Sequence, residues 1–333
     1  MNESQNRLSL TRATPCLTRR AWQPFPATGS FLFALAFAAA VIAAAAHSAT
    51  AAEKGVTLAL TADIFPTDAK AISDVILEYP SLSAVLLAGD TDNATPTPLE
   101  SYRKLYKDTY DRFLDRIYPS PGNHDRHSTP PFSAYCKFWG QAAHAPGMYY
   151  SFDLGGWHIV SLDSVTFAKD EAQAGAQLKW LKADLAAKPK APTLVYWHYP
   201  LFSNASHCGT PKMKPLWEAI YDHGPAIVFN GHNHVYERFA PMDPEGRAVP
   251  ETKGIQEFVI CAAGANPVDK QSAKAKGPAS AKFHGGAHHV GFFTLHADGG
   301  YVYSVESITG KKVREVVDQG AGNLLGGPKP AME

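Results

Sequence analysis

The segment Gly231-His232-Asn233-His234-Val235-Tyr236-Glu237-Arg238 directly follows the apolar run Ile227-Val228-Phe229-Asn230. The run is typical of a buried strand, and the two histidines stand one residue apart on the turn after it. Neutral imidazole is a common metal ligand, and two rings so spaced can direct their nitrogen atoms into one pocket. Histidines on turns are frequent, so the pair indicates a metal site only if further ligands follow other strands.

Oxygen and nitrogen donors do follow the other strand-like runs of this chain. The donors that stand just past such runs are Asp63, Asp90, Asn123, His198, His232 and His234. The carboxyl ends of strands converge on one crevice in an open α/β sheet, so we expect these side chains to meet. Such a set suits two metal ions about 3.5–4 Å apart, which can clamp a phosphate and activate water. A zinc–thiolate site is not expected, because no cysteine belongs to the set.

The rest of the sequence predicts strands that alternate with helices. Residues 149–162, with Gly155-Gly156 at their centre, predict a β-hairpin. The amphipathic segment 173–187 predicts a helix, and the Tyr- and Lys-rich segment 98–116 predicts a second, exposed helix. Beyond about Lys311 the chain is rich in Gly and Lys, and we expect residues 313–333 to form a flexible C-terminal tail.

Composition limits the classes of partner. The chain has 333 residues, of which 31 are basic and 31 are acidic, and 45% of it is hydrophobic. No net charge attracts nucleic acid or an anionic membrane, so neither is an expected partner. The length fits one large α/β domain or two small ones. The oligomeric state does not follow from the sequence.

Residues 1–52 resemble an export leader. Arginines precede an Ala- and Phe-rich run at 31–46, and small residues follow at 47–52. This order predicts cleavage near Ala51 or Ala52 and an exported protein, periplasmic or secreted. An uncleaved leader that anchors the chain in a membrane is the alternative, although the run is short for a span. Thr18-Arg19-Arg20 loosely resembles a twin-arginine signal.

Four blocks in a fixed order carry a family resemblance. They are Gly89-Asp90, Gly122-Asn123-His124-Asp125, Tyr196-Trp197-His198-Tyr199-Pro200 and Gly231-His232-Asn233-His234. Together they resemble the signature of calcineurin-like metallophosphoesterases. The hairpin at 149–162 and the Tyr236-Glu237-Arg238 extension resemble the purple acid phosphatase branch, particularly its short bacterial members. The resemblance covers about residues 55–310 and implies a four-layer α/β/β/α sandwich with two mixed β-sheets, in a catalytic domain at 53–312.

The resemblance also implies a role for each matching residue. Asp90 bridges two metal ions, Asp63 and His234 bind the first, and Asn123, His198 and His232 bind the second. His124 contacts the phosphate, Asp125 orients His124 from behind, and His207 contacts the substrate and helps protonate the leaving group. The implied reaction is hydrolysis of a small phosphate monoester by attack of metal-bound hydroxide. The implied cofactors are two ions of Fe, Zn or Mn.

Two departures from the family pattern fall on the first metal. Phe65 stands where the family usually has His or Gly two residues after the aspartate, and it cannot ligate. Asn93 stands where the purple branch has a tyrosine. A neutral amide replaces the phenolate that ferric iron prefers, so we expect a colourless protein. The first site is expected to be weaker and exchangeable, with Asn93, Asp92 or water filling the gap.

Other conspicuous residues have plainer interpretations. His288 and His289 resemble a metal pair, but a surface loop near the rim of the site is the favoured interpretation. The tryptophans are expected to pack in the core or a groove, and Cys136, Cys208 and Cys261 to be isolated thiols. The lysines of 270–282 are expected on a solvated loop.

Two alternative functions remain open at this stage. One is a phosphodiesterase or nucleotide pyrophosphatase on the same scaffold, because pocket shape decides that preference. The other is an exported binding protein with a degenerate metal site, an interpretation that only Phe65 and Asn93 support.

Overall fold

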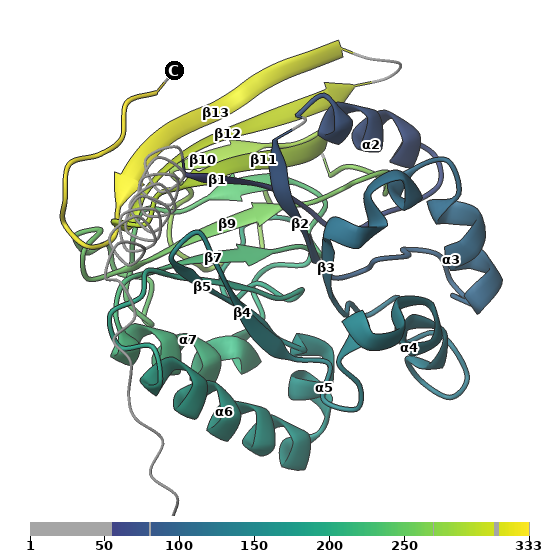
Figure 1. Ribbon diagram of the computed structural model, residues 1–333, viewed down its shortest axis with the longest axis horizontal. Helices are drawn as coiled ribbons and strands as arrows, with labels where there is room; N and C mark the ends of the chain where they lie inside the picture. Colours follow the sequence, from purple (N-terminus) through teal and green to yellow (C-terminus); the bar gives the residue numbers. More distant parts are fainter. Residues whose placement is uncertain (1–54, 80, 269, 310–312, 333) are drawn as a thin grey trace, which may run out of the picture. The chain divides into compact units, whose positions relative to one another are not determined.

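The computed structural model describes residues 55–79, 81–268, 270–309 and 313–332, which form two β-sheets flanked by helices (Figure 1). The first sheet has the strand order β13-β12-β11-β1-β2-β3. Its parallel half consists of β1 (Val56–Thr61), β2 (Leu82–Ala88) and β3 (Ile117–Ser120). Its antiparallel half consists of β11 (His288–Leu295), β12 (Gly300–Thr309) and β13 (Val313–Asn323).

The second sheet has the order β10-β8-β9-β7-β6-β5-β4. Its parallel strands are β5 (Trp157–Ser161), β6 (Thr193–Tyr196), β7 (Ala226–Asn230) and β9 (Ile255–Ile260). Antiparallel strands close both edges, namely β4 (Tyr150–Leu154), β8 (Tyr236–Arg238) and β10 (Lys282–His284). Each sheet is therefore mixed. The predicted hairpin at 149–162 is confirmed as β4 and β5.

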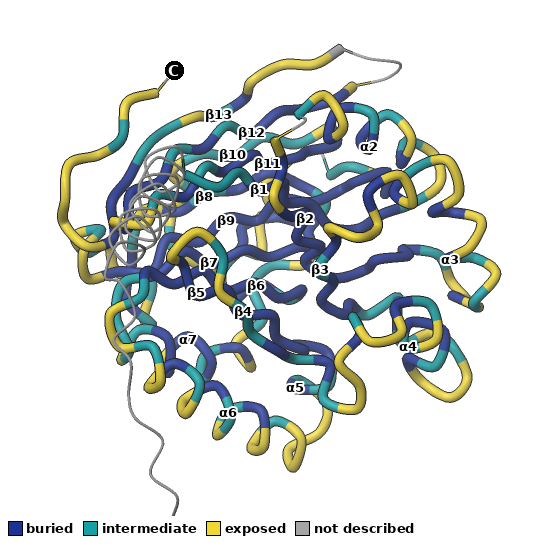
Figure 2. Tube along the Cα trace, in the orientation of Figure 1, coloured by how far each residue is buried: buried dark blue, intermediate teal, exposed yellow. Residues whose placement is uncertain are grey.

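Three hydrophobic layers hold the sandwich together. The inner faces of the two sheets pack against each other through residues such as Leu58, Phe229 and Phe293. Helices α2 (Ala69–Leu77), α3 (Leu99–Tyr106) and α4 (Ser133–Trp139) cover the outer face of the first sheet. Helices α5 (Ser164–Lys169), α6 (Glu171–Ala186) and α7 (Lys214–His223) cover the second sheet. Figure 2 shows the buried strands between these partly exposed helices. The predicted four-layer α/β/β/α fold is confirmed.

Local sequence explains where these elements begin and end. β2 reads as an almost unbroken apolar run because it is buried on both faces of its sheet. Helix α6 begins at Asp170, whose side chain accepts a hydrogen bond from the Gln173 N–H at 3.0 Å. The predicted exposed helix at 98–116 divides into α3 and a 3₁₀ segment, Tyr110–Arg116. Shorter 3₁₀ turns occupy Gly140–Ala143 and Pro211–Met213.

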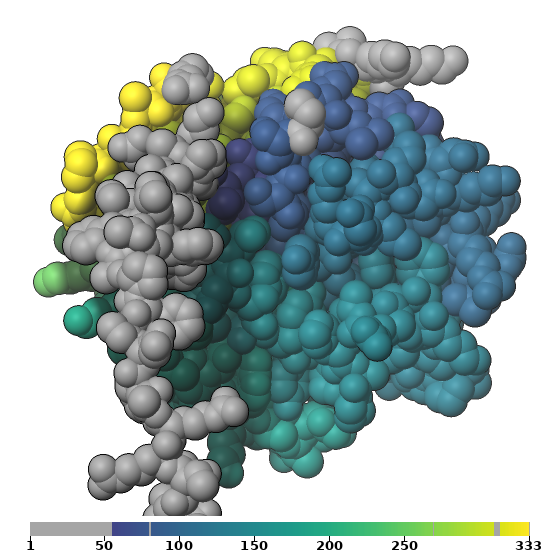
Figure 3. All heavy atoms as spheres, in the orientation of Figure 1, coloured from purple at the N-terminus to yellow at the C-terminus, as the bar shows by residue number. Residues whose placement is uncertain are grey.

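The predicted flexible tail at 313–333 is wrong for its first half. Residues 313–323 form the edge strand β13, which pairs with β12 along its whole length. Arg314 on β13 also forms ion pairs with Glu78, at the end of α2, and with Glu306 on β12. Figure 3 shows this C-terminal segment, in yellow, beside the purple and blue residues that begin the domain.

The favoured interpretation of His288 and His289 as a surface loop is also wrong. Both residues belong to β11, and both are buried. His288 Nδ1 lies against the Ala262 carbonyl, and its Nε2 lies 3.0 Å from Asp68 Oδ2. Both histidines are therefore part of the packed interior of the first sheet.

The predicted leader at 1–52 lies outside the described residues. No helix within 55–79, 81–268, 270–309 and 313–332 is long and apolar enough to cross a membrane. Cys136, Cys208 and Cys261 are free thiols in this part of the chain.

Candidate metal centre

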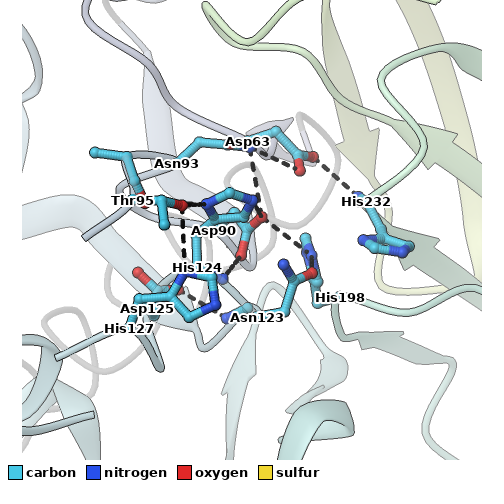
Figure 4. Close-up of polar contacts among 12 residues, drawn as sticks. Asp63, Asp90, Asn93, Thr95, Asn123, His124, Asp125, His127, His198 and His232 are labelled. Atoms are coloured by element: carbon cyan, nitrogen blue, oxygen red, sulfur yellow. Dashed lines mark hydrogen bonds and ion pairs between the residues drawn. The ribbon is translucent and has the colours of Figure 1, made fainter. Parts of the chain in front are cut away.

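The predicted ligands lie at the carboxyl ends of strands from both sheets. They follow β1 (Asp63), β2 (Asp90), β3 (Asn123), β6 (His198) and β7 (His232 and His234). The strands run parallel within each sheet, so their ends converge at one edge of the sandwich. Figure 4 shows the labelled side chains gathered around Asp90. Ligand atoms of Asp63, Asp90 and His198 all lie within 4.8 Å of one another.

Several of these residues have an unusual backbone conformation. The φ angles of Asp63, Asp90, His232 and His234 are 60°, 46°, 75° and 52°. Such left-handed values are uncommon outside glycine, and they persist where the surrounding structure fixes them for a purpose. The strain lies on residues that direct side chains into the cluster.

A first group of donors surrounds the amide of Asn93. Its Nδ2 lies 3.4 Å from Asp63 Oδ1, from Asp90 Oδ2 and from His234 Nε2. His234 Nε2 also lies 3.4 Å from Asp63 Oδ1, and its Nδ1 donates to the Asn266 carbonyl at 2.9 Å. The Asn266 bond leaves Nε2 of a neutral His234 ring free as a ligand.

A second group surrounds His198. Its Nε2 lies 3.0 Å from Asn123 Oδ1 and 3.4 Å from Asp90 Oδ2, while its Nδ1 donates to the Ala88 carbonyl at 3.0 Å. The His232 ring centroid lies 5.0 Å from that of His198. One oxygen of Asp90, Oδ2, lies 3.4 Å from both Asn93 Nδ2 and His198 Nε2, a position that suits a bridging carboxylate. Asp63 also links the groups, since its Oδ2 accepts from the His232 backbone N–H at 3.0 Å.

The charge balance of the cluster favours cations. Asp63 and Asp90 are almost completely buried. In the described residues, their ion-pair partners are histidines alone, namely His124, His198 and His234. Burial opposes ionisation of Asp90, but the neighbouring His198 and His124 lower its pKa to about 2. Buried carboxylates need a compensating charge, which metal ions supply.

Burial and the neighbouring carboxylates act in opposite directions on the histidine rings. Burial is outweighed by Asp90 at His198, whose pKa rises to about 9, and by Asp63 at His234, whose pKa is also raised. Burial lowers the pKa of His232 well below its usual range, and the charge of His198 adds to the effect. A neutral imidazole is the form that binds a metal ion. Oxygen and nitrogen donors around two buried carboxylates therefore fit divalent ions such as Zn²⁺, Mn²⁺ or Fe²⁺.

Asp92 and Phe65 do not complete the first group of donors. Asp92 Oδ1 accepts a hydrogen bond from the Ala94 N–H at 3.0 Å, and burial raises the pKa of Asp92. The Phe65 N–H donates to the Ala263 carbonyl at 3.1 Å, so this residue contributes to the backbone scaffold. Asn93 is thus the candidate closest to the Asp63 and His234 ligand atoms.

His124 is held by a loop that the sequence did not indicate. Its backbone N–H donates to Asp90 Oδ1 at 2.7 Å, and its Nε2 lies 3.9 Å from Asp90 Oδ2. Its Nδ1 donates to the Ala94 carbonyl at 3.0 Å and lies 2.9 Å from Thr95 Oγ1. The ring therefore presents Nε2 toward the cluster (Figure 4).

The expectation that Asp125 orients the His124 ring is wrong. Among the hydrogen bonds of the described residues, none joins the Asp125 carboxylate to that ring. Asp125 accepts instead from both the N–H and the hydroxyl of Thr91, and from Asp92 N, Gly122 N and Tyr102 Oη. Burial, with the charge of Asp90, raises the pKa of Asp125 to about 7. Asp125 therefore fastens the loop after β2 to the turn after β3.

Gly122 makes the approach of these two loops possible. A Cβ at this position would lie 2.0 Å from the Asp90 N and 2.1 Å from Asp90 Oδ1. Any side chain at this position would displace the bridging carboxylate.

His207 lies at the edge of the cluster, where the resemblance implied a substrate-contacting residue. Its ring centroid lies 4.8 Å from that of His232 and 6.5 Å from that of His234. Its backbone N–H donates to Asn233 Oδ1 at 3.1 Å, which ties this loop to the His232–His234 turn. Burial lowers the pKa of His207, and His234 adds to the effect. The Tyr199 ring, 4.6 Å from that of His232, was not singled out in the sequence.

A family model described as calcineurin-like phosphoesterase matches residues 57–236, more than half of the chain. The chain belongs to the calcineurin-like phosphoesterase family. The matched range contains the whole candidate centre, from Asp63 to His234. The family resemblance of the four sequence blocks is thereby confirmed.

Named relatives support the purple acid phosphatase branch. Purple acid phosphatase 21 of Arabidopsis thaliana is 33% identical over 178 residues, which cover 47% of this chain and 39% of that protein. The chain spans roughly two fifths of the length of the curated relatives it matches.

Solved structures support the fold. The purple acid phosphatase PPD1 of yellow lupin (Lupinus luteus) aligns with a TM-score of 0.57 at 13% identity, over 84% of this chain and 57% of that one. GAP50 of Plasmodium aligns with a TM-score of 0.59 at 15% identity, over 80% and 88%. At such identities the likeness concerns the fold alone.

Proposed function

We propose that this protein is a dinuclear metal-dependent phosphoesterase that hydrolyses small phosphate monoesters. The observation that carries the proposal is the convergence of two buried carboxylates, Asp63 and Asp90, with four further oxygen and nitrogen donors. In the described residues, the ion-pair partners of these carboxylates are histidines alone. When bound, two ions supply positive charge for the phosphate oxygens and activate water for attack on phosphorus. The family membership agrees with this assignment.

Each group of donors would hold one ion. Asp63 and His234, with Asn93 beside them, form the first site. Asn123, His198 and His232 form the second, and Asp90 bridges the two. The geometry that supports this division is the contact of Asp90 with Asn93 on one side and with His198 on the other.

His124 would contact the substrate phosphate. The Ala94 carbonyl accepts from Nδ1, which leaves Nε2 on the side of Asp90. With Nε2 facing the phosphate, the ring would stabilise the charge that develops during the reaction.

His207, next to His232, would act on the leaving group. Its lowered pKa makes the protonated ring a stronger acid, which favours transfer of a proton to the departing oxygen. The centroids of the His207 and His232 rings are 4.8 Å apart, which places His207 beside the proposed second site.

The proposal is tested by paired measurements on Asp90→Ala and His232→Ala. We expect both variants to lose turnover of an aromatic phosphate monoester and to bind less Zn²⁺, Mn²⁺ or Fe²⁺ by elemental analysis. Lys179→Ala, on the exposed face of α6, is the matched control and should retain both properties. Full activity in both site variants would refute the proposal.

Two other activities are separated by simple comparisons. A phosphodiesterase would favour a diester over a monoester with the same leaving group. A binding protein would hold one ion or none and would turn over neither ester with any added ion. Fold alone does not decide, because the related fold of GAP50 belongs to a protein described as an anchor in the inner membrane complex of Plasmodium. Export of this chain, periplasmic or secreted, remains part of the proposal.

A further inference from the structure

A hydroxyl group connects His124 to a second histidine outside the cluster. Thr95 Oγ1 lies 2.9 Å from His124 Nδ1 and 3.2 Å from His127 Nδ1, and Figure 4 shows Thr95 beside both rings. The two ring centroids are 5.2 Å apart. His127 is exposed, so its ring is accessible to a ligand.

The direction of these hydrogen bonds follows from the Ala94 carbonyl, which can only accept. His124 Nδ1 donates to it and therefore carries a proton. Thr95 Oγ1 then accepts from the same N–H and donates its own proton to His127 Nδ1. A neutral His127 consequently bears its proton on Nε2, where it can donate to a ligand.

A pocket of about 330 Å³ opens beside His127. Its walls include Pro96, Pro98, Leu99 and Ala134, and Lys137 supplies an ammonium group. The volume lies at the lower end of the range of about 300–1,000 Å³ that small-molecule sites occupy. His127 lines the pocket, and its ring centroid lies 5.2 Å from that of His124, so the pocket adjoins the loop that carries His124.

The surroundings of this pocket are positive. Lys137 lines it, and Lys169 and Arg126 lie near His127. Burial and His124 lower the pKa of His127, Asp90 acts in the opposite direction, and Lys169 and Arg126 lower it further. In the part of the chain that the structure describes, none of these three cations forms an ion pair with a carboxylate. A cationic pocket with apolar walls suits a compact organic group that carries a negative charge.

We propose that the pocket formed by His127, Lys137 and the 96–99 segment binds the alcohol half of the substrate, and that this half carries a second anionic group. The inference rests on the proposed phosphoesterase function and specifies its substrate class. The phosphate lies against His124, the organic part contacts the proline and leucine walls, and the second anion pairs with Lys137.

The test compares two esters that differ in one charge. Phenyl phosphate and 4-carboxyphenyl phosphate are hydrolysed by the wild type and by Lys137→Ala and His127→Ala, and kcat/KM is measured for each. We expect the wild type to prefer the carboxylated ester and each variant to lose about tenfold of that preference. For each protein, kcat/KM for the carboxylated ester is divided by kcat/KM for phenyl phosphate. Dividing the ratio of each variant by the wild-type ratio then removes the intrinsic difference in reactivity between the two leaving groups. Lys179→Ala, the same change on α6, should keep the wild-type ratio.

A binding measurement separates failure of this inference from failure of the proposed function. Calorimetry compares benzylphosphonate with 4-carboxybenzylphosphonate, which cannot be hydrolysed. Tighter binding of the carboxylated compound to the wild type than to Lys137→Ala supports the proposed role of the pocket. If the wild type binds in this way but hydrolyses neither ester, only the phosphoesterase function is refuted. If the wild type and both variants prefer the carboxylated compound over the uncarboxylated one to the same degree, in kinetics or in binding, the proposed role of the pocket is refuted.

Discussion

The side-chain amide nitrogen of Asn93 lies 3.4 Å from a carboxylate oxygen of Asp63. The same nitrogen lies 3.4 Å from His234 Nε2. An amide N–H group can donate to both acceptors but cannot ligate a metal ion. The first site therefore depends on rotation of this amide, which would present its neutral oxygen in place of the nitrogen.

Replacing Asn93 should strengthen the first site. Asn93→Asp supplies an anionic oxygen at the same length, and we expect about tenfold tighter binding of the more weakly held ion. Elemental analysis and metal titration of the wild type and the variant measure this change. Unchanged stoichiometry and affinity in Asn93→Asp would show that residue 93 does not contribute to the site.

Colour provides a separate prediction about Asn93. The wild type loaded with iron should be colourless, because no phenolate lies among the donors of the cluster. Asn93→Tyr restores a phenolate, and we expect a visible absorption band once iron is bound. A purple band in the iron-loaded wild type would contradict this account.

A methyl group at Gly122 should disable the centre. Gly122→Ala places a Cβ within about 2 Å of Asp90, so the loop after β2 must move, and we expect a loss of stability of about 2–4 kcal/mol. Urea denaturation measures the loss, and elemental analysis should show less bound metal. Gly175→Ala is the matched control, because a Cβ on this exposed α6 residue meets nothing within 4 Å. That variant should be as stable as the wild type or more stable by about 0.5–1 kcal/mol; equal losses in both variants would count against the steric explanation.

The sequence predicted the arrangement of the metal ligands for a simple physical reason. Each donor follows a strand by two to four residues, and parallel strands bring such positions to one edge of a sheet. The same alternation of strand-like runs and polar turns predicted the α/β class of the fold. No local pattern indicated Thr95 and His127, because they lie 32 residues apart and only the packing of the loop after β2 against the turn after β3 joins them.

The errors have tertiary causes. Strand β13 contains glycines and charged residues that alone favour a flexible chain, and its pairing with β12 is what orders it. Gly320 illustrates the point, since a Cβ there would lie 2.7 Å from the hydroxyl of Tyr303 on β12. In the sequence this glycine suggests a flexible chain, but in the structure it leaves space for the ring of Tyr303. His288 and His289 also follow a glycine-containing stretch that suggests a loop. Pairing with β12 nevertheless makes both residues part of strand β11.

The acceptor role of Asp125 predicts a large effect of a small change. Donors point at both of its oxygens: Tyr102 Oη lies 2.5 Å from Oδ1 and Gly122 N lies 2.7 Å from Oδ2. Asp125→Asn places an NH₂ group against donors in either orientation, so we expect a loss of about 3 kcal/mol in the free energy of unfolding. Tyr102→Phe, which removes one donor, should cost about 1 kcal/mol. Urea unfolding curves compare the two, and a variant Asp125→Asn as stable as the wild type would refute this role.

His158 predicts a pH dependence of stability away from the metal centre. Its Nε2 lies 2.8 Å from Asp184 Oδ2 and its Nδ1 lies 3.0 Å from Asp153 Oδ1. Burial opposes protonation, but hydrogen bonds to Asp184 and Asp153 outweigh it and raise the pKa of His158 above its ordinary value of 6.5. The stabilisation is therefore complete below pH 6.5 and is lost as the pH rises through the folded-state pKa.

Removing the ring should flatten this dependence. We expect the wild type to lose on the order of 1 kcal/mol more stability than His158→Gln between pH 6 and pH 9. Urea unfolding at both pH values measures the difference, with the same metal content in each sample. In Asp153→Asn, His158 keeps Asp184 as a partner. The stability that this variant loses between pH 6 and pH 9 should therefore lie between the losses of the wild type and His158→Gln. Parallel losses in the wild type and His158→Gln would mean that folding does not raise the pKa of His158.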